Sequence, residues 1–547
     1  MSFNNLVEIL QYRAATVPDA VAYTYLEDGT GEVSLTYAEV YAQAQKFAGA
    51  LAVKSAPGDR VMIILPPGLE YVTAFYGCLL ANRIAVPSYP LINGKGMERI
   101  LAIVQRATPK VIMGPASHKP GLQALAQMTQ GAVLCPEELD AAETEGEVHL
   151  TVNPQDVAFI QFTSGSTGDP KGVMVSHANL MANLQAIKDC FGLSEASVGV
   201  SWLPPYHDMG LVAGILGAVF VGGRSINMSP FSFIQKPLRW LEAISRYRGN
   251  VSGGPNFAYR LCRERIKPED LAALDLSSWH VAFCGAEPID QHNQSVFTET
   301  FSDAGFSSDA WLNCYGLAES TLIVSGTRGR RSVRDGRVGC GDIVNNHQVM
   351  IVDPNTGLRV DDGREGEIWV GGPSVAQGYW NDADKTGETF QGRVSGAGEE
   401  DVFLRTGDLG YLHKGELFVT GRLKDLIIIR GANYYPQDIE SVAGSAHEAL
   451  NGGSIAAFPI AHEGEERLVI VAEIRKAFRR MDNTDVVLGE MMKAVTAQFS
   501  LRPHEIVLAD VGSVPKTTSG KIRRQQCKLD YLGGRVKAFQ PVTTVCS

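Results

Sequence analysis

Residues 163–177 read TSGSTGDPKGVMVSH and follow the apolar run VAFIQF at 157–162. Glycines let backbone N–H groups approach anionic oxygens, the Ser and Thr hydroxyls add donors, and Lys171 adds a positive charge. These are the physical requirements of a loop that wraps a triphosphate. The GxxxxGKS/T spacing of a P-loop is absent from this segment, which disfavours a P-loop NTPase. A plain Ser- and Gly-rich turn is the alternative interpretation.

Apolar runs and helical stretches alternate on both sides of this loop. Strands are predicted at VMIIL (61–65), KVIMG (110–114) and VAFIQF, and a helix is predicted at EYVTAFYGCLLAN (70–82). This alternation predicts α/β layers around a largely parallel sheet. Residues 347–372 read HQVMIVDPNTGLRVDDGREGEIWVGG, in which Asn-Thr-Gly and Asp-Asp-Gly turns between short strands indicate antiparallel hairpins. We therefore expect a β-rich subdomain to close the large domain.

The length of 547 residues exceeds what one hydrophobic core usually serves, so at least two domains are expected. After GRLKDLIIIRG (421–431), a pattern of helix and strands follows in PQDIESVAGSAHEAL (436–450) and RLVIVAEI (467–474). This pattern predicts a small α/β domain. We place the large domain at 1–424 and the small domain at 425–547, and we interpret RVSGAGEED (393–401) as a solvated loop.

Composition excludes several classes of protein. The net charge is −11 and there is no long basic run, which argues against a nucleic-acid surface. Nine scattered cysteines without a CxxC pair indicate reduced thiols in a cytoplasm, and Glu8 interrupts the apolar N-terminal stretch that a signal peptide would need. LVAGILGAVFV (211–221) is about half a membrane span, so we predict a buried helix rather than an integral membrane segment. Its Gly and Ala content leaves open a ligand tunnel beside it.

Several segments together resemble the ANL adenylate-forming superfamily, which includes acyl-CoA synthetases, adenylation domains and luciferases. TSGSTGDPKG resembles its phosphate loop, and the other matches follow in the family's order over nearly the whole chain: LPPYHDMGL (203–211), GAEP (285–288), YGLAES (315–320), TGD (406–408), GRLKDLIIIRG (421–431) and PKTTSGKIRR (515–524). The resemblance implies an α/β fold, with a large N-terminal adenylation domain that includes a β-rich subdomain, and a small mobile C-terminal α+β domain.

The resemblance also implies a nucleotide site that binds ATP. Tyr315 would stack on or flank the adenine, and Gly285, Ala286 and Glu287 would line its pocket. Asp408 would accept hydrogen bonds from the ribose hydroxyls, with Arg422 as the nearby ribose or phosphate contact, although either residue alone is more often part of a structural ion pair. The remaining cofactor-binding positions implied are Thr163, Ser164, Gly165, Ser166, Thr167, Gly168, Lys171, Gly316, Leu317, Ala318 and Ser320.

The resemblance implies catalytic or mechanical roles for four further residues. Glu319 would be the acid associated with Mg2+, and Lys521 would contact the attacking carboxylate and the α-phosphate during adenylation. Lys424 lies at the hinge about which the small domain rotates. His207 borders the acyl and nucleotide pockets and would act as a gate. The alternatives are a surface acid for Glu319, solvated lysines at 521 and 424, and a satisfied core histidine at 207.

Within the superfamily, four phrases resemble fatty acyl-AMP ligases: WLPPYHDMGLV, SGGPNFAYRLC, GEIWVGGPSVAQGYW and GRLKDLIIIRGANYYPQDIE. Members of that family convert fatty acids to acyl adenylates and pass the acyl group to the phosphopantetheine thiol of a holo acyl carrier protein instead of CoA. They commonly serve polyketide, lipopeptide or complex-lipid assembly. Cys284 and the pair Asn313-Cys314 depart from the family pattern, which puts the acyl specificity in doubt.

The family's extra insertion is not identifiable between Leu322 and Met350, so CoA stays open as an acceptor and an acyl-CoA ligase is the alternative enzyme. A non-catalytic adenylate-binding protein is the alternative of another class. Such a protein would be expected to lack Lys521, Glu319 or the phosphate loop, and all three are present. A basic cluster in the same region fits either an acidic carrier protein or a solvated loop; it consists of Arg328, Arg330, Arg331 and Arg334.

Overall fold

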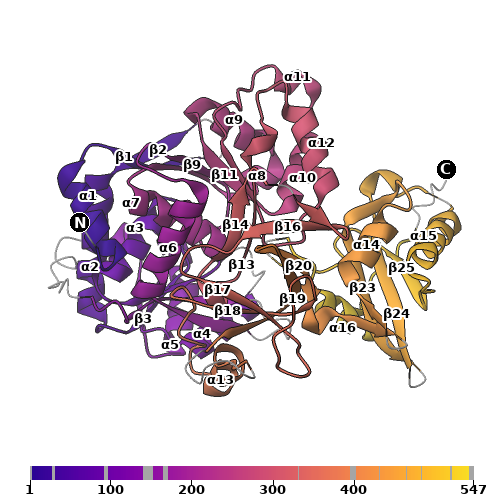
Figure 1. Cartoon of the computed structure of the whole chain (residues 1–547). Coiled ribbons are helices and arrows are strands. Elements are labelled where there is room, and N and C mark those ends of the chain that lie inside the picture. The colour runs from indigo at the N-terminus through magenta and orange to yellow at the C-terminus, as the bar shows by residue number, and fades with distance from the viewer. Residues whose placement is uncertain are drawn as a thin grey trace, which may run out of the picture. The chain divides into compact units, whose positions relative to one another are not determined.

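Figure 1 shows a computed structural model of the chain. The structure describes residues 3–27, 31–91, 97–139, 152–163, 170–330, 332–394, 402–429, 432–462, 465–481, 483–517 and 520–540. These residues form two compact units. The first unit holds the described residues up to Thr163, then 170–406 and 411–419, and the second holds 407–410 and the chain from Thr420 onward.

The first unit contains a six-stranded sheet in the order β6-β5-β3-β4-β7-β8. All neighbours are parallel except β7 and β8, which form an antiparallel pair. The strands are β3 (Arg60–Ile63), β4 (Ile84–Pro87), β5 (Val111–Met113), β6 (Ala132–Leu134), β7 (Val157–Thr163) and β8 (Lys171–Ser176). The predicted strands at 61–65, 110–114 and 157–162 are confirmed, and so is the largely parallel pairing.

An eight-stranded sheet follows the order β14-β13-β12-β11-β9-β10-β1-β2. Its six inner strands run parallel, and an antiparallel strand closes each edge. The strands are β1 (Val21–Leu26), β2 (Glu32–Thr36), β9 (Val198–Ser201), β10 (Arg224–Met228), β11 (Val251–Gly254), β12 (Val281–Cys284), β13 (Trp311–Gly316) and β14 (Ile323–Arg328).

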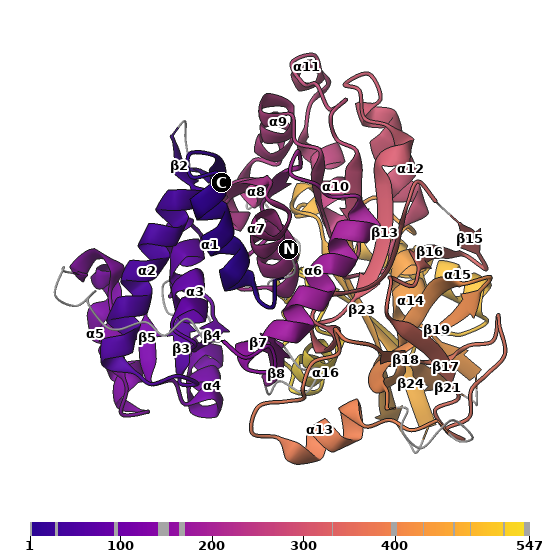
Figure 2. The ribbon, with the colours of Figure 1, turned by 60° about the vertical axis from the view of Figure 1, so that its left-hand side comes forward.

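Helices cover both sheets. Figure 2 shows α1, α2 and α3 next to one another, and α2 starts at a capping box in which Thr36 and Glu39 satisfy each other's backbone N–H groups. Around α9, α10 and α12 the core is aromatic, with ring centroids 5.2 Å apart for Trp240 and Trp279. The helices of this unit are α1 (Leu6–Thr16), α2 (Tyr37–Lys54), α3 (Leu69–Leu80), α4 (Met97–Ala107), α5 (Lys119–Gln127), α6 (His177–Phe191), α7 (Gly217–Val221), α8 (Pro230–Gln235), α9 (Leu238–Tyr247), α10 (Asn256–Arg265), α11 (Pro268–Leu271), α12 (Gln291–Phe301) and α13 (Ala383–Phe390).

The apolar stretch 211–221 is helical and largely buried, as predicted, but its first part belongs to a π-helix, Met209–Leu216 (η4), which α7 continues. Hydroxyl donors outside the helix support this wider turn: Ser225 donates to the carbonyl of Gly214 at 2.8 Å, and Tyr23 donates to that of Ile215 at 2.9 Å. Among the described residues, no helix is both long enough and apolar enough to cross a membrane.

A second six-stranded sheet has the order β15-β16-β20-β19-β18-β17, which confirms the predicted β-rich region. β17 and β18 pair antiparallel, as the turn pattern at 347–372 indicates. The described part of 322–350, where an insertion was sought, holds β14 to β16 and the start of β17. The strands are β15 (Val333–Arg334), β16 (Arg337–Asp342), β17 (Gln348–Val352), β18 (Gly366–Gly371), β19 (Leu404–His413) and β20 (Glu416–Arg422). Most of the predicted loop 393–401 lies outside the described residues.

The second unit is an α+β structure around a sheet in the order β23-β24-β25, antiparallel and then parallel. Its core includes Ile439 from α14, Ile470 from β24 and Met491 from α15. The boundary between Lys424 and Asp425 stays a prediction. The elements are β21 (Ile427–Ile429), β22 (Ala432–Tyr434), α14 (Pro436–Gly444), β23 (Leu450–His462), β24 (Glu465–Ile474), α15 (Thr484–Phe499), β25 (Glu505–Ala509) and α16 (Arg524–Leu532).

Candidate active site

The two described ends of the predicted phosphate loop lie opposite each other. Thr163 ends β7, Lys171 begins β8, and the two residues pair directly across the antiparallel ladder. This pairing fixes the position from which the Lys171 side chain starts. Residues 164–169 of the loop lie outside the described residues; they include the predicted cofactor-binding positions Ser164, Gly165, Ser166, Thr167 and Gly168.

Tyr379 links Lys171 to the predicted magnesium acid. The Lys171 ammonium lies 4.7 Å from the centroid of the Tyr379 ring, and the Tyr379 hydroxyl donates to Oε1 of Glu319 at 2.8 Å. The Tyr379 segment runs along β8, since the Trp380 N–H donates to the carbonyl of Gly172 at 2.7 Å. Residues far apart in the sequence are thereby brought into one polar cluster.

Tyr379 is only 5% exposed, and this burial favours the neutral, protonated form of its phenol. Burial raises the pKa of Tyr379 far above its ordinary value, and the neighbouring Glu319 carboxylate raises it further. The phenol therefore stays a neutral donor. A carboxylate has about four acceptor positions, so one hydrogen bond on Oε1 leaves Glu319 capacity to bind a cation.

The predicted adenine-pocket segment begins where β12 ends. A Cβ on Gly285 would lie 2.6 Å from the carbonyl oxygen of Cys314, so only glycine permits this approach of β12 to β13. Ala286 has φ = +69°, a left-handed conformation that is uncommon for alanine and occurs preferentially at functional sites. Glu287 accepts a hydrogen bond from the N–H of Phe257 at 2.7 Å, at the start of α10. Sequence reasoning gave Glu287 a ligand role and missed this cap.

The next segment, from Tyr315 to Ser320, folds back on itself. Tyr315 is nearly buried at the end of β13, and a Cβ on Gly316 would lie 1.9 Å from the carbonyl oxygen of Leu322. The Leu317 N–H donates to that same carbonyl at 2.9 Å, and Ala318–Ser320 form a single 3-10 turn. This turn carries Glu319. The cofactor roles of the segment stay predictions.

His207 and Asp208 form a local pair. Nδ1 of His207 lies 2.5 Å from Oδ1 of Asp208, and the same oxygen accepts the Met209 N–H at 2.7 Å. Asp208 thus binds the first N–H of the π-helix and orients the imidazole. The side chain of His207 is 27% exposed, so it is not a fully buried core histidine. Its role as a gate stays a prediction.

In the second unit, Asp408 and Arg422 form an ion pair. The Arg422 Nε lies 2.9 Å from Oδ1 of Asp408, whose side chain is 8% exposed, whereas that of Arg422 is 57% exposed. The structure therefore brings together the two residues that the resemblance assigns to the ribose. The ion pair also matches the alternative structural interpretation, and their ligand role stays a prediction.

Lys521 lies at the end of a tight turn in the second unit. Its N–H donates to Oγ1 of Thr517 at 3.0 Å, its carbonyl accepts the Thr517 N–H at 2.7 Å, and Gly520 has φ = +84°. These bonds fix the backbone from which the side chain extends. The predicted hinge residue, Lys424, lies exposed in the short turn Leu423–Asp425.

Arg524 connects the turn Leu423–Asp425 to the rest of the second unit, a contact that sequence reasoning missed. Its Nε and Nη2 each donate to one Glu440 carboxylate oxygen at 2.7 Å, and its Nη1 donates to Asp425 at 3.2 Å. All three side chains are largely buried. No local spacing signals this cluster, because Arg524 lies 84 residues from Glu440 and 99 residues from Asp425.

The arginines of the basic cluster lie in different environments. Arg330 forms an ion pair with Asp342 at 2.6 Å, and Arg334 lies 3.4 Å from Asp335. Arg328 is exposed at the end of β14, and Arg331 lies outside the described residues. Intramolecular pairing of two arginines favours the solvated-loop interpretation over a dedicated partner surface.

Comparisons with known proteins agree with this fold. The model of the AMP-binding enzyme family matches residues 10–380. The medium-chain-fatty-acid–[acyl-carrier-protein] ligase JamA of Moorena producens is 37% identical, covering 100% of this chain and 98% of JamA. The 4-hydroxyphenylalkanoate adenylyltransferase of Mycobacterium tuberculosis is 34% identical, covering 97% and 92%.

Among solved structures, a fatty acyl-adenylate ligase of Legionella pneumophila in complex with acyl adenylate and pyrophosphate is 39% identical. Its TM-score is 0.75, with 97% of this chain and 96% of that chain covered. The chain belongs to the AMP-binding enzyme family. The sequence-based assignment to the adenylate-forming superfamily and to its fatty acyl-AMP ligases is confirmed.

Proposed function

We propose that this enzyme activates a fatty acid with ATP, forms an enzyme-bound acyl adenylate, releases pyrophosphate and transfers the acyl group to a holo acyl carrier protein. The full-length likeness to JamA, a ligase named for a medium-chain fatty acid and an acyl carrier protein, carries the proposal. The Legionella enzyme, which is similar over nearly its whole length, holds an acyl adenylate and pyrophosphate.

In the first half-reaction a carboxylate oxygen attacks the α-phosphorus of ATP, and the bond from that phosphorus to the bridging oxygen of pyrophosphate breaks. The Lys171 ammonium, positioned by the Tyr379 ring, supplies positive charge beside the β- and γ-phosphates. Asp408 accepts hydrogen bonds from the ribose hydroxyls, and Tyr315 flanks the adenine. Lys521 lies between carboxylate and α-phosphate, which otherwise repel each other.

Mg2+ is part of the proposal, and the residues present fit it. Carboxylate oxygen is a ligand that Mg2+ prefers, and the ion commonly uses one or two carboxylates together with substrate phosphates. Glu319 supplies such a carboxylate, and the Tyr379 hydroxyl fixes its orientation through Oε1. When bound, the ion neutralises the charge that develops on pyrophosphate as it leaves.

In the second half-reaction the phosphopantetheine thiol gives up its proton to water, its sulfur attacks the acyl carbonyl carbon, and AMP leaves with the electrons of the broken C–O bond. A rotation of the small domain about Lys424 would replace the pose used for adenylation with the pose used for acyl transfer. We also propose a cytoplasmic location, which the eight free thiols among the described cysteines support.

The test incubates purified protein with ATP, Mg2+ and a panel of fatty acids, and offers CoA or holo acyl carrier protein in separate reactions. Mass spectrometry detects acyl-AMP and both thioesters. Acyl-AMP with transfer only to the carrier protein is the expected result. Efficient acyl-CoA formation would replace the proposed acceptor and make the protein an acyl-CoA ligase. Absence of adenylate with every acid would refute the proposed substrate class.

A further inference from the structure

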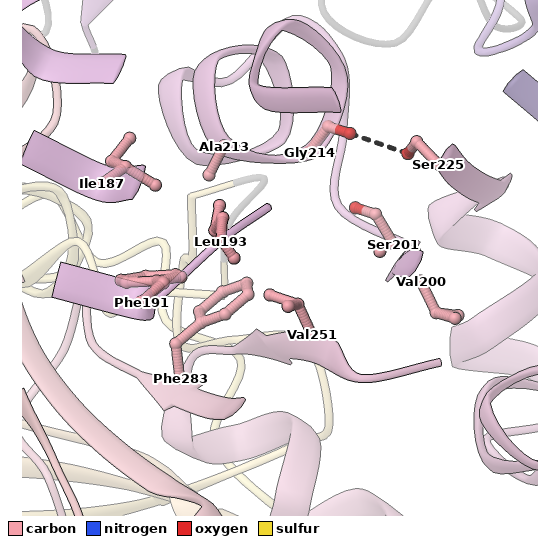
Figure 3. Close-up of a pocket in the computed structure, with 11 residues that line it drawn as sticks. Ile187, Phe191, Leu193, Val200, Ser201, Ala213, Gly214, Ser225, Val251 and Phe283 are labelled. Carbon is pink, nitrogen blue, oxygen red and sulfur yellow. Dashed lines mark hydrogen bonds between the residues drawn. The ribbon is translucent and has the colours of Figure 1, made fainter. Parts of the chain in front are cut away.

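An apolar cavity lies between α6, the π-helix and one face of the eight-stranded sheet (Figure 3). The cavity has a volume of about 40 Å3, counted as the space open to the centre of a water-sized sphere. A single water molecule needs roughly 10–15 Å3 counted in this way, so the cavity is larger than one water. Ile187 and Phe191 come from α6, and Ala213 from the π-helix. Protein interiors are otherwise close-packed, so a hollow of this size calls for a cause.

The cause is a row of small residues. Gly199 in β9 lies beside Ser225 of β10 and Val251 of β11, with which it pairs in the sheet. A Cβ on Gly199 would meet its nearest atom only at 3.8 Å, the carbonyl oxygen of Arg224, so the space above it is open. Gly214 opposite contributes no side chain. A bulky residue at position 199 would project into the cavity, whereas a Cβ at position 214 would lie only 3.0 Å from Oγ of Ser201.

The cavity lies below the edge of the sheet at which the nucleotide segments gather. Phe283 lines it from β12 and precedes Gly285 by two residues, a rise of roughly 7 Å along a strand. Ser201 lines it from β9, and the chain then continues to His207. In parallel sheets ligands bind at the carboxyl ends of the strands. A chain that entered between sheet and π-helix from this edge would reach the cavity.

Two hydroxyl groups and two aromatic rings are part of the lining of the cavity. Ser225 donates its hydroxyl to the carbonyl of Gly214 at 2.8 Å, and Oγ of Ser201 accepts the Leu203 N–H at 3.2 Å. Ser225 thus donates its proton to the backbone, whereas Ser201 accepts from the backbone and can still donate its own proton. The Phe191 and Phe283 rings, with centroids 5.6 Å apart, form one wall (Figure 3). The lining is otherwise mostly apolar, with Ile187, Phe191 and Val251 among its members, which suits a methylene or methyl group.

We propose that this cavity receives the methyl end of a straight aliphatic acyl chain and that Gly199 is a specificity-determining residue for chain length. The inference rests on the proposed function, because it assigns the far end of the acid that the enzyme adenylates. It also predicts a preference for alkyl over hydroxyphenyl ends. A hydroxyphenyl ring would need more width than a straight chain.

The test substitutes Gly199→Val, since valine suits a strand and its side chain would project into the open space. Acyl-AMP formation is measured over a series of straight-chain acids from short to long, and over hydroxyphenyl-ended acids. The matched control is Gly387→Val in α13, where an added Cβ meets nothing within 4 Å. Circular dichroism melting confirms folding, and Gly199→Ala replaces the valine variant if that variant does not fold.

Gly199→Val should lower the rate for the longest accepted acids by at least ~10-fold relative to the shortest, because one methylene in a fixed pocket changes discrimination by that order. Phe191→Leu, which opens the wall, should shift the optimum toward longer acids. An unchanged chain-length profile in both folded variants, an equal loss for every acid, or a wild-type preference for hydroxyphenyl ends would overturn the inference. Absence of adenylate from the wild type with every acid would instead refute the proposed function.

Discussion

Replacement of Arg524 by methionine should loosen the second unit while leaving the first intact. The guanidinium lies between Glu440 and Asp425, and the three side chains are 18%, 7% and 13% exposed, respectively. Burial alone would lower the pKa of Arg524, but the two carboxylates raise it well above its ordinary value, so the group stays charged. Methionine would keep much of the packing volume and leave two buried carboxylates without their cation.

The magnitude follows from burial. Removing one partner of a buried ion pair costs about 3–5 kcal/mol, because the remaining charge stays in a poorly solvated place. Each 1.4 kcal/mol changes an equilibrium tenfold, so the opening equilibrium of the second unit should rise roughly 100-fold to several thousand-fold. Glu440 also accepts the Ala457 N–H at 3.0 Å, a bond that would hold its carboxylate in place and prevent escape to water.

Cys527 reports this opening. It is 0% exposed in α16, and burial raises the pKa of its thiol to about 12, so it reacts with a thiol reagent only when the unit opens. Peptide-resolved mass spectrometry should show its labelling accelerated by the predicted factor in the Arg524→Met variant. All six tryptophans lie at or before Trp380, in the first unit, so the tryptophan fluorescence transition should not move.

The matched control is Arg535→Met, which removes an exposed ion pair with Asp530 in the same unit. The Arg535 side chain is 61% exposed and lies 3.0 Å from Asp530, so its loss should change Cys527 labelling by less than about 5-fold. If the Arg524→Met variant labels Cys527 no faster than this control does, the buried cluster does not hold the unit together and the reasoning is wrong.

Three further predictions concern the first unit and Lys521, the predicted catalytic lysine. Burial lowers the pKa of His177 to about 4, against about 6.5 unfolded; the unfolded chain therefore binds the extra proton over that range, and stability falls as pH drops from 6.5 toward 4. Urea midpoints should show this loss, about 2 kcal/mol between pH 7 and pH 5, disappearing in His177→Asn, and an equal loss in the variant would contradict it. Tyr379→Phe should keep the ring beside Lys171 but slow adenylation on the order of 10-fold and raise the Mg2+ concentration needed for half-maximal rate, because the charged Glu319 carboxylate loses the hydrogen bond that it accepts from the phenol; an unchanged Mg2+ dependence would reject that positioning role. Lys521→Ala should slow acyl-AMP formation on the order of 100- to 1000-fold while Lys493→Ala, at an exposed position of α15, stays near the wild-type rate. An unaltered rate in Lys521→Ala would remove the lysine from the mechanism.

Much of the fold was predictable because local patterning and global structure agree. The run VAFIQF is a strand in the sequence pattern and in the structure, and the turns at 347–372 gave the correct antiparallel pair. The π-helix was not predictable, because apolar content reports burial and not the helix type. Its wider turn depends on hydroxyls from Tyr23 and Ser225, which lie on other strands.

The candidate site, like the fold, could be predicted from the sequence only in part. Gly285 and Gly316 are singled out through the motifs GAEP and YGLAES, and the structure adds a reason for glycine at both, since a Cβ would lie too close to the carbonyl oxygens of Cys314 and Leu322. Glu287 was harder, since its cap on Phe257 joins residues 30 apart. A segment's own residue types carry information about its backbone path, whereas a side chain's partner across the fold leaves no trace in spacing.

Tyr379 and Arg524 share this second property, and the consequence extends to catalysis. Tyr379 contacts Glu319 over 60 residues of sequence, and Arg524 contacts Asp425 over 99, so neither contact belongs to a single motif. Yet each orients a residue next to or within a motif: Tyr379 orients Glu319, the predicted magnesium acid, and Arg524 orients Asp425, in the turn of the predicted hinge residue Lys424. Substitutions at these two positions should therefore change the reaction although neither residue has been assigned a reactive group, since a motif supplies a reactive group and the fold around it supplies that group's direction.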